Sequence, residues 1–397
     1  MKKTISLFLC AMALISLMGC SEKDATVSTA IQTTVPDITA TESPATEPIT
    51  QPDQRPMVAL SLPVNILRNA IGNVKLFEHI YQEMDVVLPE PDIAERIIID
   101  FLNRTDTAET AEKISGWANE DYDENYPDWI RYLCQATYEP MRIDEAVLSL
   151  YGTHVEFGGI NLSQNFNDAV TYDMTTGNVI PLTTVLTNIS RDELCELLTE
   201  QLAQQKDTLS LFDDFPDTIR DRFSGSLADE KDWYFTETGL CFFFTPYEIA
   251  PYASGTVTAQ IPYHALAGKM NDAYFPPEQD QTLGNIALID FSAENANRFN
   301  QFAELTLPYG NRNMLLYTDL SVTDVRIEYL ESAQDSASLD SSYTIFAAPH
   351  LTPGDAVKIE FSNEDLKNLR LRYTSSGKIH YAYFTLQNDN HTVTLND

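Results

Sequence analysis

Apolar residues recur at regular intervals along the chain, and the interval in each stretch predicts its secondary structure. Residues 91–104 follow two prolines and place apolar side chains three and four positions apart, which predicts a helix. Residues 190–206 begin with the capping-box spacing of Ser190 and Glu193 and continue with leucines at helical intervals, which predicts a second helix. Apolar and polar residues alternate between these helices, and the predicted strands cover residues 130–138, 146–151, 154–157 and 168–173.

The last third of the chain shows a similar alternation but no helical stretch. Its predicted strands cover residues 286–291, 314–318, 323–329, 343–347, 356–361, 369–373, 378–386 and 392–395. The polar stretch at residues 271–284, which contains Pro276 and Pro277, indicates a domain boundary before them. The pattern predicts an α+β fold, an antiparallel sheet with packed helices, followed by a C-terminal all-β sandwich-like domain.

The N-terminus is typical of an export signal. Lys2 and Lys3 precede an apolar run at residues 5–18, which is short for a membrane-spanning helix, and Leu17-Met18-Gly19-Cys20 resembles a lipobox. We expect residues 1–19 to be a lipoprotein signal peptide and Cys20 to carry the lipid, on the extracytoplasmic face of a bacterial cell membrane. An ordinary cleaved signal peptide is the alternative, and it also places the mature protein outside the cytoplasm.

Residues 20–56 are rich in threonine, serine, alanine, proline and acidic residues and contain few large side chains. Such a segment does not bury enough apolar surface to fold, so we expect a disordered linker. The remaining chain is long enough for more than one core. We expect an α+β domain at residues 57–270 and a C-terminal β domain at residues 284–397.

The chain is strongly acidic, with 59 aspartates and glutamates against 25 lysines and arginines and a formal net charge of -34. This charge argues against binding to nucleic acid and against direct adsorption to anionic lipid. It favours a cationic partner or divalent cations, and solubility alone is a sufficient alternative explanation.

The sequence contains no recognisable catalytic or metal-binding motif. Its six histidines lack metal-ligand spacing, and no nucleophile motif is present. Three cysteines remain beyond the signal and the lipobox, Cys134, Cys195 and Cys241, and each lies in an apolar pattern typical of a buried thiol. One disulfide among them stays open as an alternative. We expect no catalytic residue, no metal and no cofactor.

Residues 239–263 form the most informative stretch of the chain. Apolar residues at 240–244 and alternating residues at 257–261 predict two strands, and a loop stiffened by two prolines joins them. The candidate ligand-binding residues lie in this loop and are Tyr247, Glu248, Pro251 and Tyr252. The alternative is that these side chains pack over the sheet and fix the loop.

The order Phe-Phe-Thr-Pro-Tyr-Glu-Ile-Ala-Pro-Tyr-Ala-Ser-Gly in this stretch, followed by Ile-Pro-Tyr, resembles the hallmark of the DUF3298 family. That family includes the extracellular part of lysozyme-sensing anti-sigma factors. Residues 138–178 likewise resemble the DUF4163 module that usually precedes it. Related proteins often carry a Gly-Gly-Ala-His-Gly type element where this chain has Phe157-Gly158-Gly159-Ile160-Asn161, so a role of that histidine does not carry over.

The resemblance implies binding rather than catalysis, with peptidoglycan or a muramidase such as lysozyme as the ligand. The acidic composition independently favours the muramidase, because lysozymes are usually cationic. An envelope hydrolase with an unrecognised site is the alternative, and a purely structural wall protein is a third interpretation.

Overall fold

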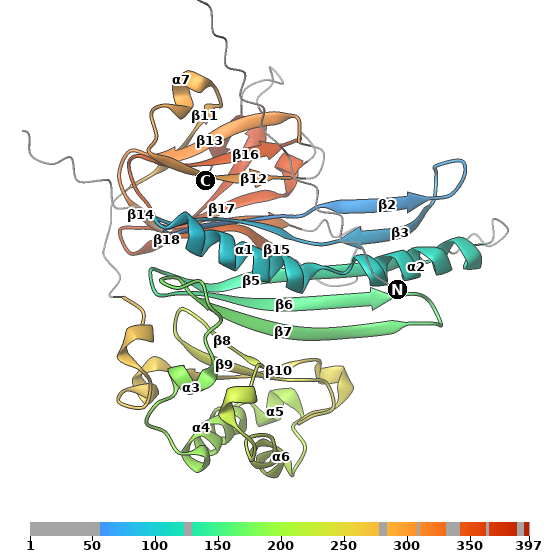
Figure 1. Ribbon diagram of the computed structural model, residues 1–397, viewed down its shortest axis with the longest axis vertical. Helices are drawn as coiled ribbons and strands as arrows, with labels where there is room; N and C mark the ends of the chain where they lie inside the picture. Colours follow the sequence, from blue (N-terminus) through green and yellow to red (C-terminus); the bar gives the residue numbers. More distant parts are fainter. Residues whose placement is uncertain are drawn as a thin grey trace, which may run out of the picture. The chain divides into compact units, whose positions relative to one another are not determined.

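The computed structural model describes residues 56–122, 129–277, 284–307, 310–330, 342–362, 365–386 and 393–396 (Figure 1). All of these residues belong to one unit that begins at Thr50. The predicted lipidation residue Cys20 and nearly all of the predicted linker lie outside the described residues. No helix in the described part of the chain is long and apolar enough to cross a membrane.

Two sheets and most of the helices come from the first 270 residues. A five-stranded sheet has the order β2 (Val64–Arg68), β3 (Lys75–Ile80), β5 (Tyr132–Ile143), β6 (Val147–Phe157) and β7 (Ser163–Asp173). A three-stranded sheet has the order β10 (Val257–Pro262), β9 (Gly239–Phe244) and β8 (Trp233–Phe235). The helices of this part are α1 (Pro91–Thr105), α2 (Ala108–Asp121), α3 (Leu182–Val185), α4 (Arg191–Ala203), α5 (Lys206–Leu209) and α6 (Phe215–Arg222). Within these two sheets all neighbouring strands are antiparallel except β3 and β5, which are parallel.

Two further sheets contain the C-terminal strands. A seven-stranded sheet has the order β19 (Val393–Asn396), β18 (Lys378–Leu386), β17 (Leu369–Ser375), β14 (Val322–Leu330), β15 (Ser342–Leu351), β1 (Met57–Ser61) and β4 (Glu83–Val87). A four-stranded sheet has the order β11 (Ile286–Asp290), β13 (Arg312–Thr318), β16 (Asp355–Phe361) and β12 (Gln301–Thr306), and helix α7 (Ala293–Ala296) follows β11. Buried residues of both sheets form one apolar core, as in a sandwich. The predicted fold class is confirmed.

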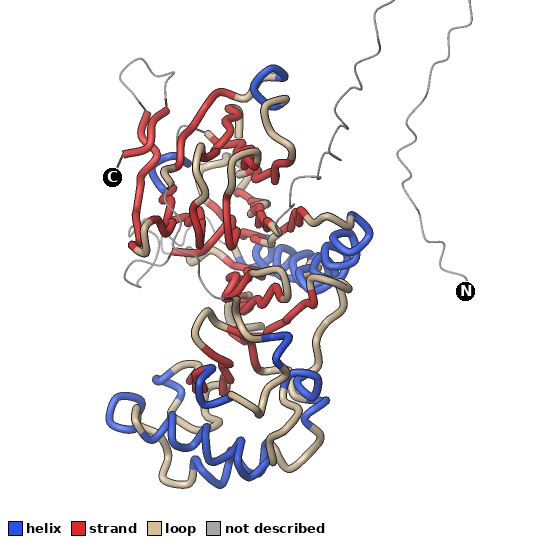
Figure 2. Tube along the Cα trace, turned by 90° about the vertical axis from the view of Figure 1, so that its left-hand side faces the viewer, coloured by secondary structure: helices blue, strands red, loops and turns tan. Residues whose placement is uncertain are grey.

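The predicted helix at residues 91–104 is α1. Its buried side chains Ala94, Ile97 and Phe101 are spaced three and four positions apart, so they lie on one face of the helix. That face packs in one core with residues of β5, β6 and β7, including Tyr138. The following helix, α2, was not predicted, and it covers the β3 and β5 end of the same sheet. In Figure 2 the helices gather in two main groups.

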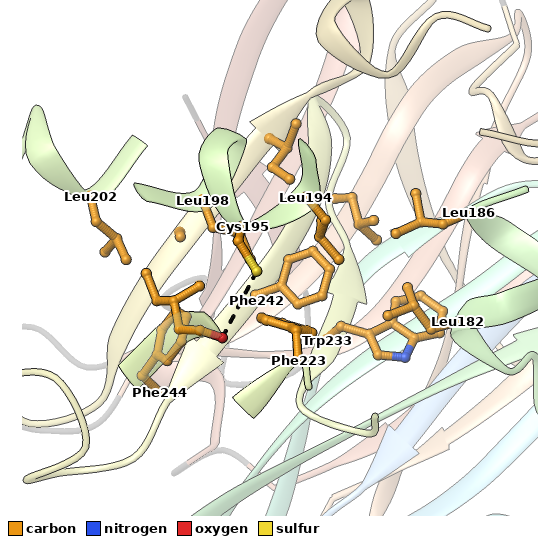
Figure 3. Packing of buried hydrophobic residues seen from close by; sticks show 14 of the residues in the cluster. Leu182, Leu186, Leu194, Cys195, Leu198, Leu202, Phe223, Trp233, Phe242 and Phe244 are labelled. Carbon is orange, nitrogen blue, oxygen red and sulfur yellow. Dashed lines mark hydrogen bonds between the residues drawn. The ribbon is translucent and has the colours of Figure 1, made fainter. Parts of the chain in front are cut away.

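The second predicted helix is α4, and Ser190 caps its N-terminus as predicted. The Ser190 hydroxyl accepts a hydrogen bond from the backbone N–H of Glu193 at 3.1 Å. Leu194, Leu198 and Leu202 are fully buried and belong to the core that also contains Trp233, Phe242 and Phe244 of the three-stranded sheet (Figure 3). This core fixes the hairpin β9–β10 against the helices.

The three cysteines are free and buried, as predicted. Cys134 lies on β5, Cys195 on α4 and Cys241 on β9, so they belong to three separate elements. Burial raises the pKa of both Cys134 and Cys241 to about 11, which keeps these thiols protonated and unreactive at neutral pH.

Strands β1 and β4 connect the predicted α+β domain to the C-terminal sheet. Both come from residues 57–87, yet β1 pairs with β15 through Val58 opposite Ala347. The predicted domain boundaries at 57–270 and 284–397 stay a prediction. Because of β1 and β4, however, the seven-stranded sheet contains residues from both ranges.

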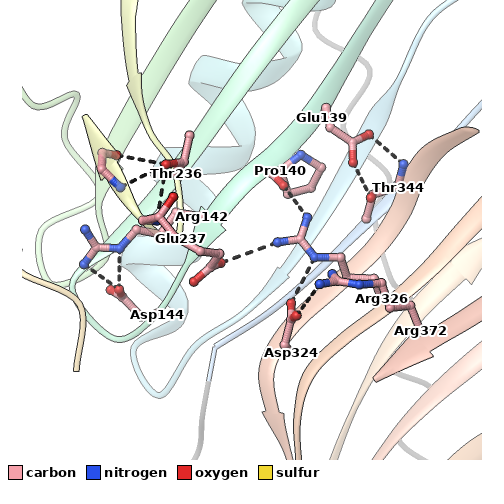
Figure 4. A network of polar contacts seen from close by, with 12 residues as sticks. Glu139, Pro140, Arg142, Asp144, Thr236, Glu237, Asp324, Arg326, Thr344 and Arg372 are labelled. Atoms are coloured by element: carbon pink, nitrogen blue, oxygen red, sulfur yellow. Dashed lines mark hydrogen bonds and ion pairs between the residues drawn. The ribbon is translucent and has the colours of Figure 1, made fainter. Parts of the chain in front are cut away.

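A polar network links β5 to β14 and β15 at this junction (Figure 4). The Arg326 guanidinium donates to the carbonyl oxygen of Pro140 at 2.7 Å, and Glu139 accepts hydrogen bonds from the backbone and hydroxyl of Thr344. Glu237, in the turn after β8, lies 3.4 Å from Arg326 beside a cavity of about 210 Å³. Burial raises the pKa of Glu237 to about 7 despite the attraction of Arg326.

Candidate functional site

The loop at residues 245–256, between β9 and β10, is called the tyrosine loop here. The Glu248 carboxylate accepts hydrogen bonds from the backbone N–H of Thr245 at 2.8 Å and from its hydroxyl at 3.2 Å. Ile249 and Ala250 are buried in the core below. Tyr247 has a φ of 72°, a left-handed conformation that is uncommon for a residue with a side chain and needs such support.

The tyrosine loop presents two exposed rings. The side chains of Tyr247 and Tyr252 are 68% and 62% exposed, and their ring centroids lie 5.5 Å apart at an interplanar angle of 33°. The two rings therefore do not pack down over the sheet, which was the alternative considered from the sequence. Pro251 is half-buried and caps the short turn that carries Tyr252.

Glu248 supports the loop from below through Arg222 at the end of α6. The Arg222 guanidinium contacts Glu230 at 2.6 Å, Glu248 at 3.2 Å and Asp232 at 3.3 Å. It also donates to the carbonyl oxygen of Phe243 on β9 at 2.8 Å. Glu248 is thus already engaged in the protein, so the structure presents it as a support for the two rings rather than as a free ligand contact.

An open groove of about 400 Å³ lies beside Tyr252 on the five-stranded sheet. It is lined by Ile130, Arg131, Leu133, Val155, Glu156, Phe157, Ser163, Gln164, Asn165 and Tyr252. Leu133 and Val155 are outward-facing residues of neighbouring strands and give the groove an apolar floor. A hydrogen bond of 2.6 Å from the Thr256 hydroxyl to Asn167 ties the tyrosine loop to β7.

Two amide side chains line the groove on β7. Gln164 and Asn165 are exposed, and their side chains have no hydrogen-bond partner among the described residues. The groove thus combines the aromatic rings of Phe157 and Tyr252, an apolar floor, two amide groups, and one arginine and one glutamate that balance in charge. These groups suit a neutral polar ligand with a flat apolar face, such as a sugar.

The segment Phe157-Gly158-Gly159-Ile160-Asn161, where related proteins often carry a Gly-Gly-Ala-His-Gly type element, forms the turn between β6 and β7, next to this groove. Gly159 has a φ of 64° there, and Ile160 is fully exposed.

The sequence indicated the tyrosine loop but not the groove. The residues of the groove lie about 90 to 120 positions before Tyr252, and no spacing along the chain indicates that they approach it.

One cluster of titratable groups was not predicted. His154 Nε2 lies 3.1 Å from the Asp168 carboxylate and 3.3 Å from the Tyr138 hydroxyl, which donates to Asp168 at 2.8 Å. The ring of Phe166 stacks on the buried imidazole at a centroid distance of 4.6 Å. Burial raises the pKa of Tyr138, so its phenol stays protonated. The cluster contains no serine or cysteine nucleophile, and its contacts explain it as a polar network inside the fold.

No group of three or more histidine, cysteine, aspartate or glutamate residues that could hold a metal occurs in the part of the chain that the structure describes. The predictions of no catalytic residue and no cofactor stay predictions.

Comparison with known proteins supports one family for part of the chain. Residues 186–264 match DUF3298, whose description is a protein of unknown function. A crystal structure of a DUF3298 member from Bacteroides fragilis NCTC 9343 shows 15% identity and a TM-score of 0.37, over 53% of this chain and 94% of that one. A DUF3298 protein from Pseudomonas aeruginosa PAO1 shows 15% identity and a TM-score of 0.37, over 56% of this chain and 97% of that one.

No curated protein matches the chain. The family match covers α4, α5, α6 and the three-stranded sheet. The chain therefore contains a DUF3298 segment at residues 186–264, and the tyrosine loop lies within it.

Proposed function

We propose that this protein is a lipid-anchored, non-catalytic binding protein of the bacterial cell envelope and that it binds the glycan of peptidoglycan at the tyrosine loop and its groove. The observation that carries the proposal is the exposed ring of Tyr252 at the rim of a groove that the exposed amide side chains of Gln164 and Asn165 also line. The resemblance to the DUF4163 module, which covers part of the groove, stays a prediction and belongs to the same proposal.

The chemistry of the groove fits a glycan for three reasons. A tyrosine ring offers a flat apolar surface for the apolar face of a sugar, and it loses little entropy because the loop is already held. The amides of Gln164 and Asn165 pair with hydroxyl and N-acetyl groups, which both donate and accept hydrogen bonds. A volume of about 400 Å³ lies within the range of small-ligand sites.

A cationic muramidase is the second candidate ligand. A net charge of -34 favours encounter with a cationic partner, and the protruding Tyr247 and Tyr252 suit insertion into a groove of that partner. Binding measured at low and at physiological salt distinguishes the glycan from the muramidase. Charge attraction weakens steeply as the Debye length falls from about 30 Å to about 8 Å, whereas stacking on a neutral glycan persists.

Replacing Tyr252 with alanine is expected to weaken binding to purified peptidoglycan about three- to tenfold, because a stacked ring contributes about 0.5–1.5 kcal/mol beyond its buried area. Tyr247→Ala is expected to have a smaller effect, since Tyr247 does not line the groove. Co-sedimentation with peptidoglycan, and parallel binding to lysozyme at low and physiological salt, measure both. Thermal unfolding of each variant reports on the fold.

Ile71→Ala is the matched control, because Ile71 is 74% exposed in the turn between β2 and β3 and lies outside the groove. Unchanged binding of Tyr252→Ala to both ligands would contradict the proposed site. Release of sugar or acetate from peptidoglycan by the purified protein would replace the binding proposal with the envelope hydrolase.

The proposed anchor is Cys20, from the lipobox-like Leu17-Met18-Gly19-Cys20. Cys20→Ala is expected to move the protein from the membrane fraction to the medium or to leave the signal uncleaved, because the thiol that carries the lipid is missing. Fractionation and immunoblotting against the unchanged chain measure this. Equal retention of both proteins in the membrane fraction, with the signal removed from both, would show that no lipid at Cys20 holds the protein.

A further inference from the structure

Strand β18 carries a row of exposed apolar side chains on the outer face of the seven-stranded sheet. Ile379, Tyr381 and Tyr383 are 54%, 44% and 45% exposed, whereas Ala382 between the two tyrosines and Phe384 after them are buried in the sandwich core. Outward residues of an antiparallel sheet are ordinarily polar, so this row, called the β18 stripe here, is unusual. Alternate residues of a strand are about 6.6 Å apart, so the two tyrosine side chains lie next to each other along one line.

Two arginines of β17 lie beside the β18 stripe. In the strand register Arg370 is opposite Tyr383 and Arg372 is opposite Tyr381, so these side chains share the outer face. The Arg370 guanidinium lies 5.0 Å from the centroid of the Tyr381 ring. Glu328 holds Arg370 at 2.6 Å.

Arg372 is held in a similar way, by Asp324 at 2.8 Å. The two carboxylates come from β14, on the side away from β18. An arginine has five N–H donors, and these ion pairs occupy only part of them. The side chains of Arg370 and Arg372 are 25% and 22% exposed, so each guanidinium is fixed in direction by its carboxylate and still reaches the surface beside the stripe.

The hairpin β17–β18 also has an unusual charge. Residues 369–386 contain Arg370, Arg372 and Lys378 and no aspartate or glutamate, in a chain with 59 acidic residues. Elsewhere the acidic residues outnumber the basic ones, so a polyanion is repelled from most of the protein. On this hairpin the two arginines are paired with Glu328 and Asp324, and Lys378 has no carboxylate partner among the described residues, so a polyanion meets the least repulsion here.

We propose that the β18 stripe, with Arg370 and Arg372, is a second binding surface for an extended acidic polysaccharide, one that carries carboxylates on its sugars. The tyrosine rings stack on the sugar faces, and the guanidinium groups bind the carboxylates, whose planar geometry they match. The open surface suits a linear chain that passes across the strand. This site is independent of the groove beside Tyr252.

The structure favours this occupant over a second copy of the chain. Strand β19 pairs with β18 only from Tyr383 to Leu386, so the β18 backbone before Tyr383 is an open edge among the described strands. A twofold contact between two such edges would bring together two chains that each carry a net charge of -34. Repulsion between the copies opposes the contact.

The test uses the full chain and three polymers. Polygalacturonate supplies sugars and carboxylates, its fully methylated ester supplies the same sugars without charge, and polyphosphate supplies charge without sugars. We expect affinity electrophoresis to show binding to polygalacturonate that weakens with salt, about tenfold weaker binding to the ester, and weaker binding to polyphosphate. Tyr381→Ala combined with Tyr383→Ala should weaken polygalacturonate binding about tenfold or more.

Two further variants make the test specific. Leu320→Ala changes a residue that is 60% exposed in the turn before β14 and should bind polygalacturonate as the unchanged chain does. Ile379→Tyr adds a third ring to the row and should bind polygalacturonate several-fold more tightly. This variant tests the stripe independently of whether the double alanine variant folds.

Three results would overturn the proposal. One is equal binding of polyphosphate and polygalacturonate, which would mean that charge alone is responsible. Another is equal polygalacturonate binding by the unchanged chain and the folded alanine pair. The third is a dimer in sedimentation that the alanine pair abolishes, which would assign the stripe to a second copy. Peptidoglycan binding lost in Tyr252→Ala is a separate result and bears only on the groove.

Discussion

Replacing Arg142 with leucine is expected to lower the free energy of unfolding by about 3–5 kcal/mol, because it leaves a buried carboxylate without its cation. Arg142 is fully buried, and its guanidinium contacts the Asp144 carboxylate at 2.6 Å and 2.7 Å. It also donates to the Tyr263 hydroxyl at 2.8 Å and to the Tyr274 carbonyl at 2.7 Å. Urea unfolding followed by tryptophan fluorescence measures the loss.

An exposed pair of the same kind provides the control. Arg220 contacts Asp217 at 2.8 Å, but the two side chains are 61% and 77% exposed, so Arg220→Leu should change stability by about 0.5 kcal/mol or less. Adding Asp144→Asn to Arg142→Leu removes the unpaired charge and keeps an acceptor oxygen, so part of the loss should be recovered. Equal losses at Arg142 and Arg220 would mean that burial does not decide the effect.

Replacing Arg222 with leucine is expected to cost about 3 kcal/mol at neutral pH and to release the tyrosine loop. The change leaves Glu230, Asp232 and Glu248 close together without a cation, and Glu230 is nearly buried. Burial already raises the pKa of Asp232, and Arg222 opposes this rise. Without Arg222 the pKa of Asp232 in the folded state rises further.

The sign of the pH dependence follows from this shift. A carboxyl whose pKa is higher in the folded than in the unfolded state binds more protons when folded, so stability falls as the pH rises above its unfolded pKa. The deficit of Arg222→Leu against the unchanged chain should therefore be largest near pH 7.5 and smaller near pH 4.5. Urea unfolding at both pH values measures it, and a deficit that is the same at both would exclude carboxylate repulsion as the cause. Arg220→Leu should show no such pH dependence.

The elements predicted best are those determined by interactions between residues close together in the sequence. Helix α4 was predicted with its cap because the Ser190 spacing satisfies a free backbone N–H within one turn. The hairpin β9–β10 was predicted because apolar runs and a proline-containing loop lie next to each other in the sequence. The predicted strands at 146–151 and 154–157 are instead one continuous strand, β6, because Gly152 marks a close approach to Asp168 and Tyr138 and not an end.

The elements missed depend on distant partners. Strand β1 is buried on both faces, so its residues 57–60 are all apolar and show no alternation. Helix α2 buries mainly the small residues Ala111 and Ala118 with Ile114, which gives a weak periodic signal.

The candidate site was predicted only in part for the same reason. The sequence indicated Tyr247 and Tyr252 as candidates, but their exposure depends on how Ile249 and Glu248 anchor the loop. The groove forms on β5, β6 and β7, whose position beside Tyr252 follows from packing between two sheets.

The position of β1 determines when the seven-stranded sheet is completed during synthesis. Val58 is made early, yet its partner Ala347 follows only after most of the chain, which at about 5–20 residues per second is an interval on the order of 15–60 s. Such long-range pairing is slow to form, because the loop between the partners must close first. A fragment that ends before β15 keeps the apolar strand β1 without this neighbour, and such an edge is prone to aggregation.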